Sequence, residues 1–340
     1  TPLKLDAATG NVTVPEAINR SLKAWFDGGW NLLEVPERLG GIGAPPSLCW
    51  AGMELISGAN PVTTFYSFGS FMARGIDALG TPAQKQRYVK PMLDGQWGGT
   101  MMLTESNAGS DVGEGTSKAK QVAGDVWELT GTKIFITNGD FDYPENIVHL
   151  VLARPEGAQG GTKGLSLFIV PKVWVKEDGT LGERNGIKVV SIEKKMGIKA
   201  SATCVMEMGG DAPCRGLLMG EVHDGIRQMF KVIENARMSI GVKSLSTLST
   251  AYLNALEYAK ERVQGPDLIK ATDKASPRVR IIQHPDVRRM LMTMRAYTEG
   301  CRAMASVAAA AYDAAHHHPD AEVRKQNQAF YEFMVPLVKG

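Results

Sequence analysis

Cysteine, net charge and long hydrophobic runs are scarce in this sequence, and each scarcity excludes a class of protein. The four cysteines among its 340 residues contain no Cys-x-x-Cys pair, so zinc knuckles and dithiol redox motifs of that kind are excluded. So few thiols in so long a chain favour a reducing compartment. The 38 basic and 36 acidic residues leave a formal charge of +2, which argues against a generally basic nucleic-acid-binding protein. No apolar run approaches the roughly 20 residues that cross a bilayer, so no transmembrane segment is predicted.

Several catalytic motifs are also absent. The sequence has no Gly-x-Ser-x-Gly elbow, Walker A loop or Gly-x-Gly-x-x-Gly fingerprint, and its glycine cluster at 40–43 runs into Pro45-Pro46 rather than into a helix. His316–His318 are consecutive, so their side chains point in different directions, which favours a solvated helix end over a metal site. The basic stretch from Lys270 to Arg295 lacks interleaved aromatic residues and favours a solvated face. Neither a metal site nor a nucleic-acid partner is predicted.

Hydrophobic periodicity predicts an α+β protein in three parts. At roughly 150 residues per domain the length suggests two or three domains. The pattern indicates an N-terminal α-helical domain at 1–97, a central β domain at 98–220 that forms a small sandwich or barrel, and a C-terminal helical domain at 221–340. Gly80 and Thr81-Pro82 are predicted to end one helix and begin the next.

The expected elements follow from the same periodicity. Helices are expected at Val14–Phe26, at Leu48–Ser57 and again from Ile226. Another helix is expected to carry Phe65, Phe68, Met72, Ile76 and Leu79 on one face. Strands are expected at Thr100–Thr104, Trp127–Thr137, Ile147–Ala153, Leu165–Val170, Ile187–Ile192 and Thr203–Met208. Residues 263–279, between two C-terminal helices, are predicted to form an exposed loop.

Two segments of the predicted β domain combine a strand with a polar turn. The first, Met101–Gly113, ends in a turn rich in Gly and Ser, which offers backbone N–H groups and hydroxyls to an anionic or strongly polar ligand. The second, Leu129–Gly139, ends a strand with a hydroxyl beside an aromatic residue. The two strand ends are therefore predicted to frame one flat ligand.

These two segments resemble the signature stretches of the acyl-CoA dehydrogenase family, which read much like LTEPGAGSD and G.K.FITNG. Ser106-Asn107 departs from the usual Pro-Gly. The resemblance covers nearly the whole chain, because the order of helices, sheet and helices also matches. It implies the acyl-CoA dehydrogenase fold and FAD as the cofactor. Gly28-Gly29-Trp30, Pro36–Gly41 and the long loop after Arg262 are more similar to the larger bacterial enzymes acting on long-chain or methylthioalkanoyl thioesters than to the short mitochondrial ones.

The resemblance implies a set of FAD contacts. Leu103 and Thr104 are expected to lie against the isoalloxazine ring, Phe135 to stack along it, and Thr137 to approach N5, the atom that accepts hydride. The alternative for Phe135 is a core residue of an alternating strand, but its neighbours favour the ligand contact. The full set of implied cofactor residues is Met101, Leu103, Thr104, Gly109, Ser110, Phe135, Ile136 and Thr137, with Arg262 and Gln283 reaching the pyrophosphate and adenosine end of a neighbouring subunit's FAD and Gln264 at a position where an aromatic residue is common.

The resemblance also implies the place of the substrate. Arg237 matches an arginine that holds the CoA moiety, a use suited to a permanent cation near phosphates. Ser110, which is expected to contact the pyrophosphate or the thioester ligand, and Glu234 are assigned to substrate binding as well.

The catalytic base of the family has no match in this sequence. Most members keep it in a Tyr-Glu-Gly-Thr-like stretch near the C-terminus, which Tyr331-Glu332-Phe333 does not match, and a minority keep it on a helix, where this chain has Ala236. No catalytic residue is therefore assigned, and the base Glu is expected beyond Gly340, so that the C-terminal domain is incomplete. Glu234 is the one acidic residue of this chain expected to approach the substrate. The chain also begins at Thr1 without Met or a secretory pattern, which favours a removed leader or a piece of a longer chain.

The function implied by the resemblance is FAD-dependent α,β-dehydrogenation of an acyl-CoA thioester, the first step of fatty acid β-oxidation. A carboxylate removes the α-proton while hydride passes to flavin N5. The resemblance further implies a homo-oligomer, dimer or tetramer, electron-transfer flavoprotein as the acceptor, and a bacterial cytoplasmic location rather than the mitochondrial matrix. Two alternatives stay open: an acyl-CoA oxidase, and a flavin-binding relative without dehydrogenase activity, such as the DNA-binding alkylation-response type.

Overall fold

The computed structural model describes residues 2–340, except for the side chains of residues 233–235. The chain is 47% helical and 24% strand, which confirms the predicted mixed class. It forms two compact units. We call Thr1–Ala44 with Val62–Glu234 the β unit, and Pro45–Pro61 with Asn235–Gly340 the helical unit. Within the described residues, no helix combines the length and the apolar composition that crossing a membrane requires.

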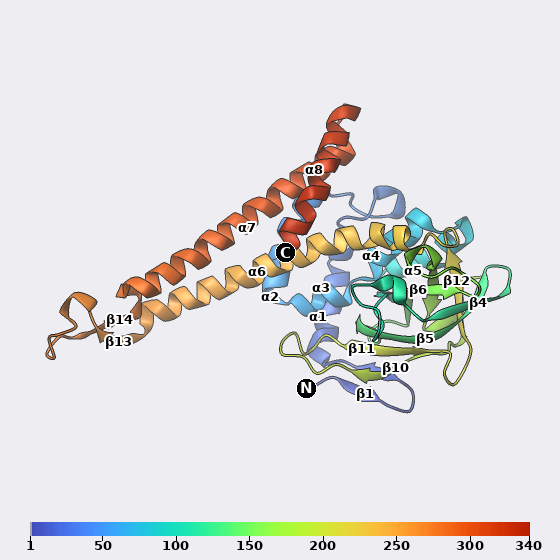
Figure 1. Cartoon of the computed structure of the whole chain (residues 1–340), viewed down its shortest axis with the longest axis horizontal. Coiled ribbons are helices and arrows are strands. Elements are labelled where there is room, and N and C mark those ends of the chain that lie inside the picture. The colour runs from blue at the N-terminus through green and yellow to red at the C-terminus, as the bar shows by residue number, and fades with distance from the viewer. Residues whose placement is uncertain (1) are drawn as a thin grey trace. The chain divides into compact units, whose positions relative to one another are not determined.

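The β unit is organised around an eight-stranded sheet (Figure 1). The strand order is β10-β11-β5-β12-β7-β6-β3, and β4 pairs with both β5 and β6. The pairs β3–β6 and β4–β6 are parallel, and the others are antiparallel. The strands of this sheet are β3 (Trp97–Met102), β4 (Lys118–Ala123), β5 (Val126–Thr137), β6 (Asn146–Pro155), β7 (Ser166–Pro171), β10 (Ile187–Ile192), β11 (Thr203–Met208) and β12 (Cys214–Met219).

Strand β6 is buried along nearly its whole length because its alternate side chains enter two different cores. Leu150 and Leu152 pack in a core with Met72 and Ile76, which belong to the helices of the β unit. Val151 and Ala153 enter a second core, which also holds Trp127 of β5, Phe168 of β7 and Ile187 of β10. This two-sided burial is what a central strand with a nearly continuous hydrophobic sequence requires.

Four helices lie wholly or mainly in the β unit: α1 (Glu16–Asp27), α3 (Pro61–Tyr66), α4 (Gly69–Leu79) and α5 (Pro82–Leu93). The predicted helix start at Thr81 is confirmed. Its hydroxyl accepts a bond from the Gln84 backbone N–H (3.3 Å), and its own N–H donates to Gln84 Oε1 (3.1 Å). This reciprocal pair is a capping box, and Pro82 follows it in the first turn of α5.

The prediction of one continuous helix face from Phe65 to Leu79 is wrong in one respect. The chain breaks at Ser67-Phe68, between α3 and α4. Gly69, at the start of α4, approaches β3 so closely that a Cβ there would stand 2.5 Å from the carbonyl oxygen of Trp97. Apolar spacing alone does not reveal such a close approach.

The sequence pattern missed several short strands. They include the hairpin of β1 (Lys4–Asp6) and β2 (Asn11–Thr13), the pair β8 (Val173–Val175) and β9 (Leu181–Arg184), and the longer β4 and β12. Three-residue strands are too short to show a two-residue period.

The helical unit contains α2 (Pro46–Ala59), most of α6 (Gly225–Glu261), α7 (Pro285–His317) and α8 (Ala321–Lys339). Its core includes Trp50, Val242, Ala308 and Tyr331, one from each of these four helices. An ion pair adds to the packing of α7 on α2, because Arg302 Nη2 lies 2.6 Å from Glu54 Oε1.

Two predictions on the helical unit have separate outcomes. The loop expected at 263–279 is exposed along most of its length, but its ends form a hairpin of β13 (Val263–Pro266) and β14 (Arg278–Arg280). His316 and His317 are exposed at the end of α7, as predicted for a solvated helix end.

Candidate functional site

The first motif leaves β3 and turns sharply. Glu105 and Ala108 exchange two backbone hydrogen bonds, of 3.0 and 3.1 Å, which close a tight turn over Ser106-Asn107. Met101, Leu103 and Thr104, which precede the turn, are half-buried, whereas Gly109 and Ser110, which follow it, are exposed. A Cβ at Gly109 would meet only the Thr104 methyl group, at 3.9 Å. The two residues after the turn therefore present an unobstructed backbone, at Gly109, and a hydroxyl, at Ser110.

The second motif contains a bulge near the end of β5. Lys133 pairs with Met206 of β11 and Ile136 pairs with Cys204, so β5 holds one more residue than β11 between these pairs. Phe135 lies in the bulge with φ 59°, and its side chain is 58% exposed. A left-handed backbone is uncommon for a large side chain, and residues strained in this way cluster at functional sites.

The residues after the bulge differ in accessibility. Ile136 is buried in the second core of the β unit, and Thr137 is half-buried at the end of the strand. Any ligand beside this strand end would therefore meet the backbone of Ile136 and the side chains of Phe135 and Thr137. The alternative interpretation of Phe135 as a core residue is wrong, because its side chain faces solvent.

The two motifs come together in the structure, as predicted. The Ile134 N–H donates to the carbonyl oxygen of Thr104 over 2.9 Å. Lys133 Nζ donates to the carbonyl oxygen of Leu103 (2.9 Å) and lies 2.8 Å from Glu105 Oε1. Thr104, Phe135 and Thr137 therefore belong to two strand ends that are bonded to each other.

The ion pair between Lys133 and Glu105 is almost completely buried, and it was not predicted from the sequence. The two side chains are 2% and 4% exposed. Burial alone would raise the pKa of Glu105, but the charge of Lys133 and hydrogen bonds from Lys133, Ser117 and Thr116 lower it to about 2. Burial lowers the pKa of Lys133, and the Glu105 carboxylate opposes that shift. The sequence does contain a signal that could have suggested this ion pair: the first motif includes the acidic Glu105, and the second includes the basic Lys133.

A second group of predicted cofactor residues lies in the helical unit. Arg262 Nη2 donates to Gln264 Oε1 (3.1 Å), and the N–H of Ile281 donates to the carbonyl oxygen of Arg262 (2.8 Å). Gln283 follows two residues after Ile281, and the side chains of Arg262, Gln264 and Gln283 are all exposed. The structure therefore brings these three residues to one end of the helical unit.

The predicted substrate residues are distributed over both units. Ser110 belongs to the β unit, and Arg237 is half-buried on the part of α6 that belongs to the helical unit. The side chain of Glu234 lies outside the described part of the chain.

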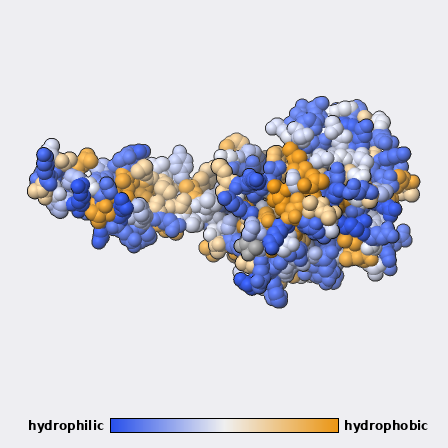
Figure 2. Space-filling model, turned by 90° about the horizontal axis from the view of Figure 1, so that it is seen from below, coloured by the Kyte–Doolittle hydropathy of each residue, from blue (hydrophilic) through white to orange (hydrophobic). Residues whose placement is uncertain are grey.

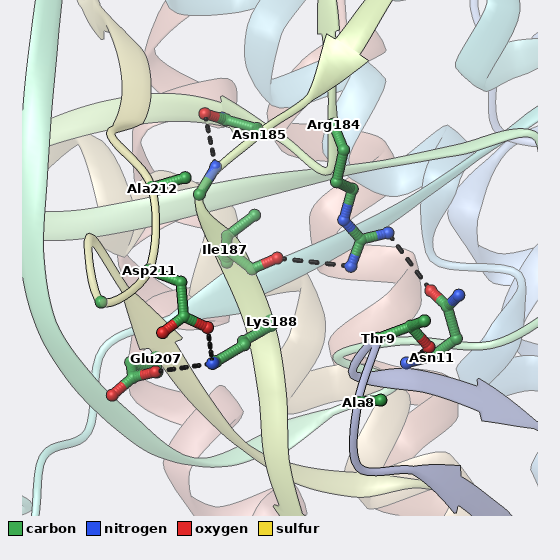
Figure 3. Close-up of a pocket in the computed structure, with 12 residues that line it drawn as sticks. Ala8, Thr9, Asn11, Arg184, Asn185, Ile187, Lys188, Glu207, Asp211 and Ala212 are labelled. Carbon is green, nitrogen blue, oxygen red and sulfur yellow. Dashed lines mark hydrogen bonds and ion pairs between the residues drawn. The ribbon is translucent and has the colours of Figure 1, made fainter.

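A separate cavity of about 470 Å³ lies in the β unit, lined by none of these predicted residues (Figure 3). Its charged side chains already have partners within the chain. Lys188 contacts Asp211 and lies 3.4 Å from Glu207, while Arg184 bonds to Asn11 Oδ1 and the carbonyl oxygen of Ile187. In the described part of the chain, no group of three or more His, Cys, Asp or Glu side chains is arranged for a metal ion.

Comparison with known proteins identifies the family. Sequence models of the N-terminal, middle and C-terminal domains of acyl-CoA dehydrogenases match residues 4–96, 100–209 and 223–329. The chain therefore belongs to the acyl-CoA dehydrogenase family, a family of FAD-dependent oxidoreductases, as its motifs predicted.

Two curated relatives and one solved structure illustrate the similarity. The chain is 50% identical to the broad-specificity linear acyl-CoA dehydrogenase FadE5 of Mycobacterium tuberculosis, over 100% of this chain and 56% of the relative. It is 42% identical to the 3-methylmercaptopropionyl-CoA dehydrogenase of Ruegeria pomeroyi, over 97% and 55%. An acyl-CoA dehydrogenase from Bacillus anthracis, solved in complex with FAD, superimposes with a TM-score of 0.75 at 25% identity, covering 95% of this chain and 52% of that one. The chain thus spans about half the length of the curated relatives it matches.

Proposed function

We propose that this chain forms the FAD- and acyl-CoA-binding part of an acyl-CoA dehydrogenase that introduces an α,β double bond into a thioester. The observation that carries the proposal is the junction of the two motifs. It places an exposed aromatic side chain, Phe135, and two half-buried hydroxyls, Thr104 and Thr137, on strand ends fixed to each other. An aromatic face with hydroxyls on a rigid frame suits a flat heterocycle with a polar edge.

The described residues fit the parts of FAD in the following way. Phe135 and Leu103 would lie against the ring system, with the hydroxyls of Thr104 and Thr137 at its polar edge. The exposed Gly109-Ser110 turn would offer N–H groups and a hydroxyl to the pyrophosphate. Met101 and Ile136 would contribute contacts from β3 and β5, and Arg262, Gln264 and Gln283 would reach the pyrophosphate and adenosine end of a neighbouring subunit's FAD. When bound, FAD accepts the hydride that leaves the β-carbon of the substrate.

The acyl-CoA would be held by Arg237, Ser110 and Glu234. The guanidinium of Arg237 supplies a permanent positive charge for the phosphates of CoA. Removal of the α-proton needs a carboxylate within about 3 Å of that proton in the bound pose. Glu234 is the candidate within this chain, and a Glu beyond Gly340 is the candidate that the family pattern favours.

The test is anaerobic reduction of the FAD-loaded protein by a series of acyl-CoA thioesters of increasing chain length. We expect loss of the flavin absorbance, and the dependence on chain length then reports the preferred substrate. Protein that takes up no FAD at micromolar concentration would contradict the proposal. Flavin binding without bleaching by any acyl-CoA, both in residues 1–340 and in a longer chain, would instead indicate a family relative without dehydrogenase activity. Rapid oxygen consumption in a separate aerobic assay would indicate an oxidase.

A matched pair of variants tests the identity of the base. If Glu234 removes the proton, Glu234→Gln slows bleaching by about 10²- to 10⁴-fold. The control is Glu257→Gln, which removes another carboxylate of α6 that pairs with Lys260 on the surface. Equal bleaching by Glu234→Gln and Glu257→Gln would remove Glu234 from the mechanism. A longer chain that bleaches far faster than residues 1–340 would place the base beyond Gly340.

We also propose a homo-oligomer, a dimer or a tetramer. At the end of the helical unit that carries β13 and β14, Leu253, Tyr258, Met292 and Tyr297 are each more than half exposed. Figure 2 shows hydrophobic surface among hydrophilic residues in this part of the molecule. Large exposed apolar side chains gathered at one end of a unit are candidates for an interaction site. Electron-transfer flavoprotein as the acceptor and a cytoplasmic location complete the proposal.

A further inference from the structure

The buried ion pair connects the two motifs to each other. Lys133 comes from the second motif and Glu105 from the first, and Lys133 Nζ also donates to the carbonyl oxygen of Leu103 (2.9 Å). Because both side chains are at least 96% buried, neither can touch a bound ligand. Their bonds act only on the protein around them.

The Glu105 carboxylate also closes a longer turn, from Glu105 to Ser117, which carries Gly109 and Ser110. The turn begins at Glu105, and the same carboxylate accepts hydrogen bonds from the Thr116 N–H (2.7 Å), the Thr116 hydroxyl (2.8 Å) and the Ser117 N–H (3.1 Å) at its far end. Within the turn, Asn107 Nδ2 donates to the carbonyl oxygen of Glu114 (3.0 Å). One buried side chain therefore holds both ends of the turn.

Lys133 anchors the strand on the other side. It is the last residue of β5 in register with β11 before the bulge, and the register resumes at Ile136. Between these two pairs Phe135 takes its left-handed backbone conformation and projects into solvent. A bulge of this kind persists only where the flanking residues are fixed.

We propose that Lys133 and Glu105 are positioning residues, which hold the Gly109-Ser110 turn and the Phe135 bulge in the arrangement that binds the flavin. The inference rests on the proposed function, because it concerns the same site. It extends that function by assigning the geometry of the site to one buried pair rather than to the residues that contact the ligand.

The experiment compares Lys133→Met with Arg74→Met, which removes another ion pair of the β unit, with Glu34, outside both motifs. FAD affinity and the flavin absorbance spectrum are measured at a temperature at which both variants are folded. Hydrogen exchange in segments 103–117 and 133–138 is measured without flavin. We expect Lys133→Met to weaken FAD binding by about tenfold or more, the equivalent of one charge-assisted hydrogen bond, and to accelerate exchange in both segments. Arg74→Met should change neither.

The outcomes separate this inference from the proposed function. If the parent protein binds FAD and Lys133→Met binds it with the affinity and spectrum of Arg74→Met, the positioning role is wrong and the proposed function stands. If the parent protein takes up no FAD, the proposed function itself fails. Should Lys133→Met not fold, Thr116→Val replaces it, because it removes one hydroxyl bond to Glu105 from an exposed residue. An unchanged FAD affinity in Thr116→Val would then overturn the inference.

Discussion

At the scale of single residues, Phe135 is the position where the protein departs most from what stability alone favours. Its left-handed backbone conformation costs about 1–3 kcal/mol for a residue with a side chain of this size, and its ring is 58% exposed, so burial repays little of that cost. A position that is strained and exposed at once is easier to understand as a ligand contact than as a packing residue.

Replacement of Phe135 should therefore separate stability from function. Asn tolerates the left-handed conformation, so we expect Phe135→Asn to raise the free energy of unfolding of the flavin-free protein by about 1 kcal/mol and to weaken FAD binding. Denaturant unfolding and FAD titration measure the two effects. The control is Phe333→Asn, the same change at an exposed position of α8, where we expect no gain in stability. If Phe135→Asn brings no gain in stability over the parent protein, as expected for Phe333→Asn, this account is wrong.

At the scale of secondary-structure elements, the parallel pair β3–β6 contains a buried histidine, which we expect to make the folded protein sensitive to acid. His149 of β6 stands opposite Thr100 of β3, and its Nδ1 lies 2.7 Å from the Thr100 hydroxyl oxygen. Burial, with smaller contributions from the charges of Lys172 and Arg184, lowers the pKa of His149 to about 3. The folded protein therefore holds this imidazole neutral at pH values where the unfolded chain protonates it.

The sign of the pH effect follows from that difference. The folded-state pKa of His149 is depressed, so its contribution to stability is fully present above about pH 6.5 and is lost as the pH falls toward 3, by about 1.4 kcal/mol per pH unit. Denaturant unfolding between pH 7 and 5 measures the slope. His149→Gln should show a shallower loss of stability with acid, although its stability at pH 7 is lower, and the exposed control His317→Gln should follow the parent. Parallel curves for His149→Gln and the parent would exclude this role.

The start of α5 offers a second prediction at this scale. Thr81→Ala removes the hydroxyl that caps the helix and leaves the Gln84 backbone N–H without its partner, so we expect a loss of about 1 kcal/mol. Thermal or denaturant unfolding measures it. Ser306→Ala, at an exposed position within α7, is the control and should change stability by less than about 0.5 kcal/mol. If Thr81→Ala lowers the free energy of unfolding no more than Ser306→Ala does, the cap does not contribute to stability.

How far the sequence predicts these elements depends on whether the information is local. The cap at Thr81, the long β5 and the two motifs depend on neighbouring residues, and the structure has them where they were predicted. The bulge at Phe135 depends on pairing with β11, and the Lys133–Glu105 pair joins positions 28 residues apart. Neither alternation nor spacing within one strand contains that information.

At the scale of the whole molecule, the grouping of α2 shows a further limit of sequence patterns. The sequence placed Leu48–Ser57 in an N-terminal domain, but the contacts of Pro45–Pro61 group it with Asn235–Gly340. Trp50 of α2 shares a core with Val242 and Tyr331, which are far away in the sequence. An amphipathic pattern shows which face of a helix is apolar, but not which helices cover it. The division at 97 and 220 stays a prediction.

The predicted FAD residues also divide between the two units, which raises the question of whether one subunit holds a whole flavin. Thr104, Phe135 and Thr137 lie in the β unit, whereas Arg262 and Gln283 lie in the helical unit. The proposed oligomer answers it by pairing the β unit of one subunit with the helical unit of another. In a two-fold assembly such an exchange is reciprocal, so each dimer holds two equivalent sites.

Mixed oligomers test this exchange directly. Thr137→Val and Arg262→Ala should each weaken FAD binding when present in every subunit. In a random mixture of the two variants, half of the dimers pair one subunit of each kind, and one of their two sites combines an intact β unit with an intact Arg262. We therefore expect about a quarter of all sites to regain the parent affinity, as measured by FAD titration of the re-formed mixture. If each subunit completes its own site, every site in the mixture carries one substitution and no affinity returns.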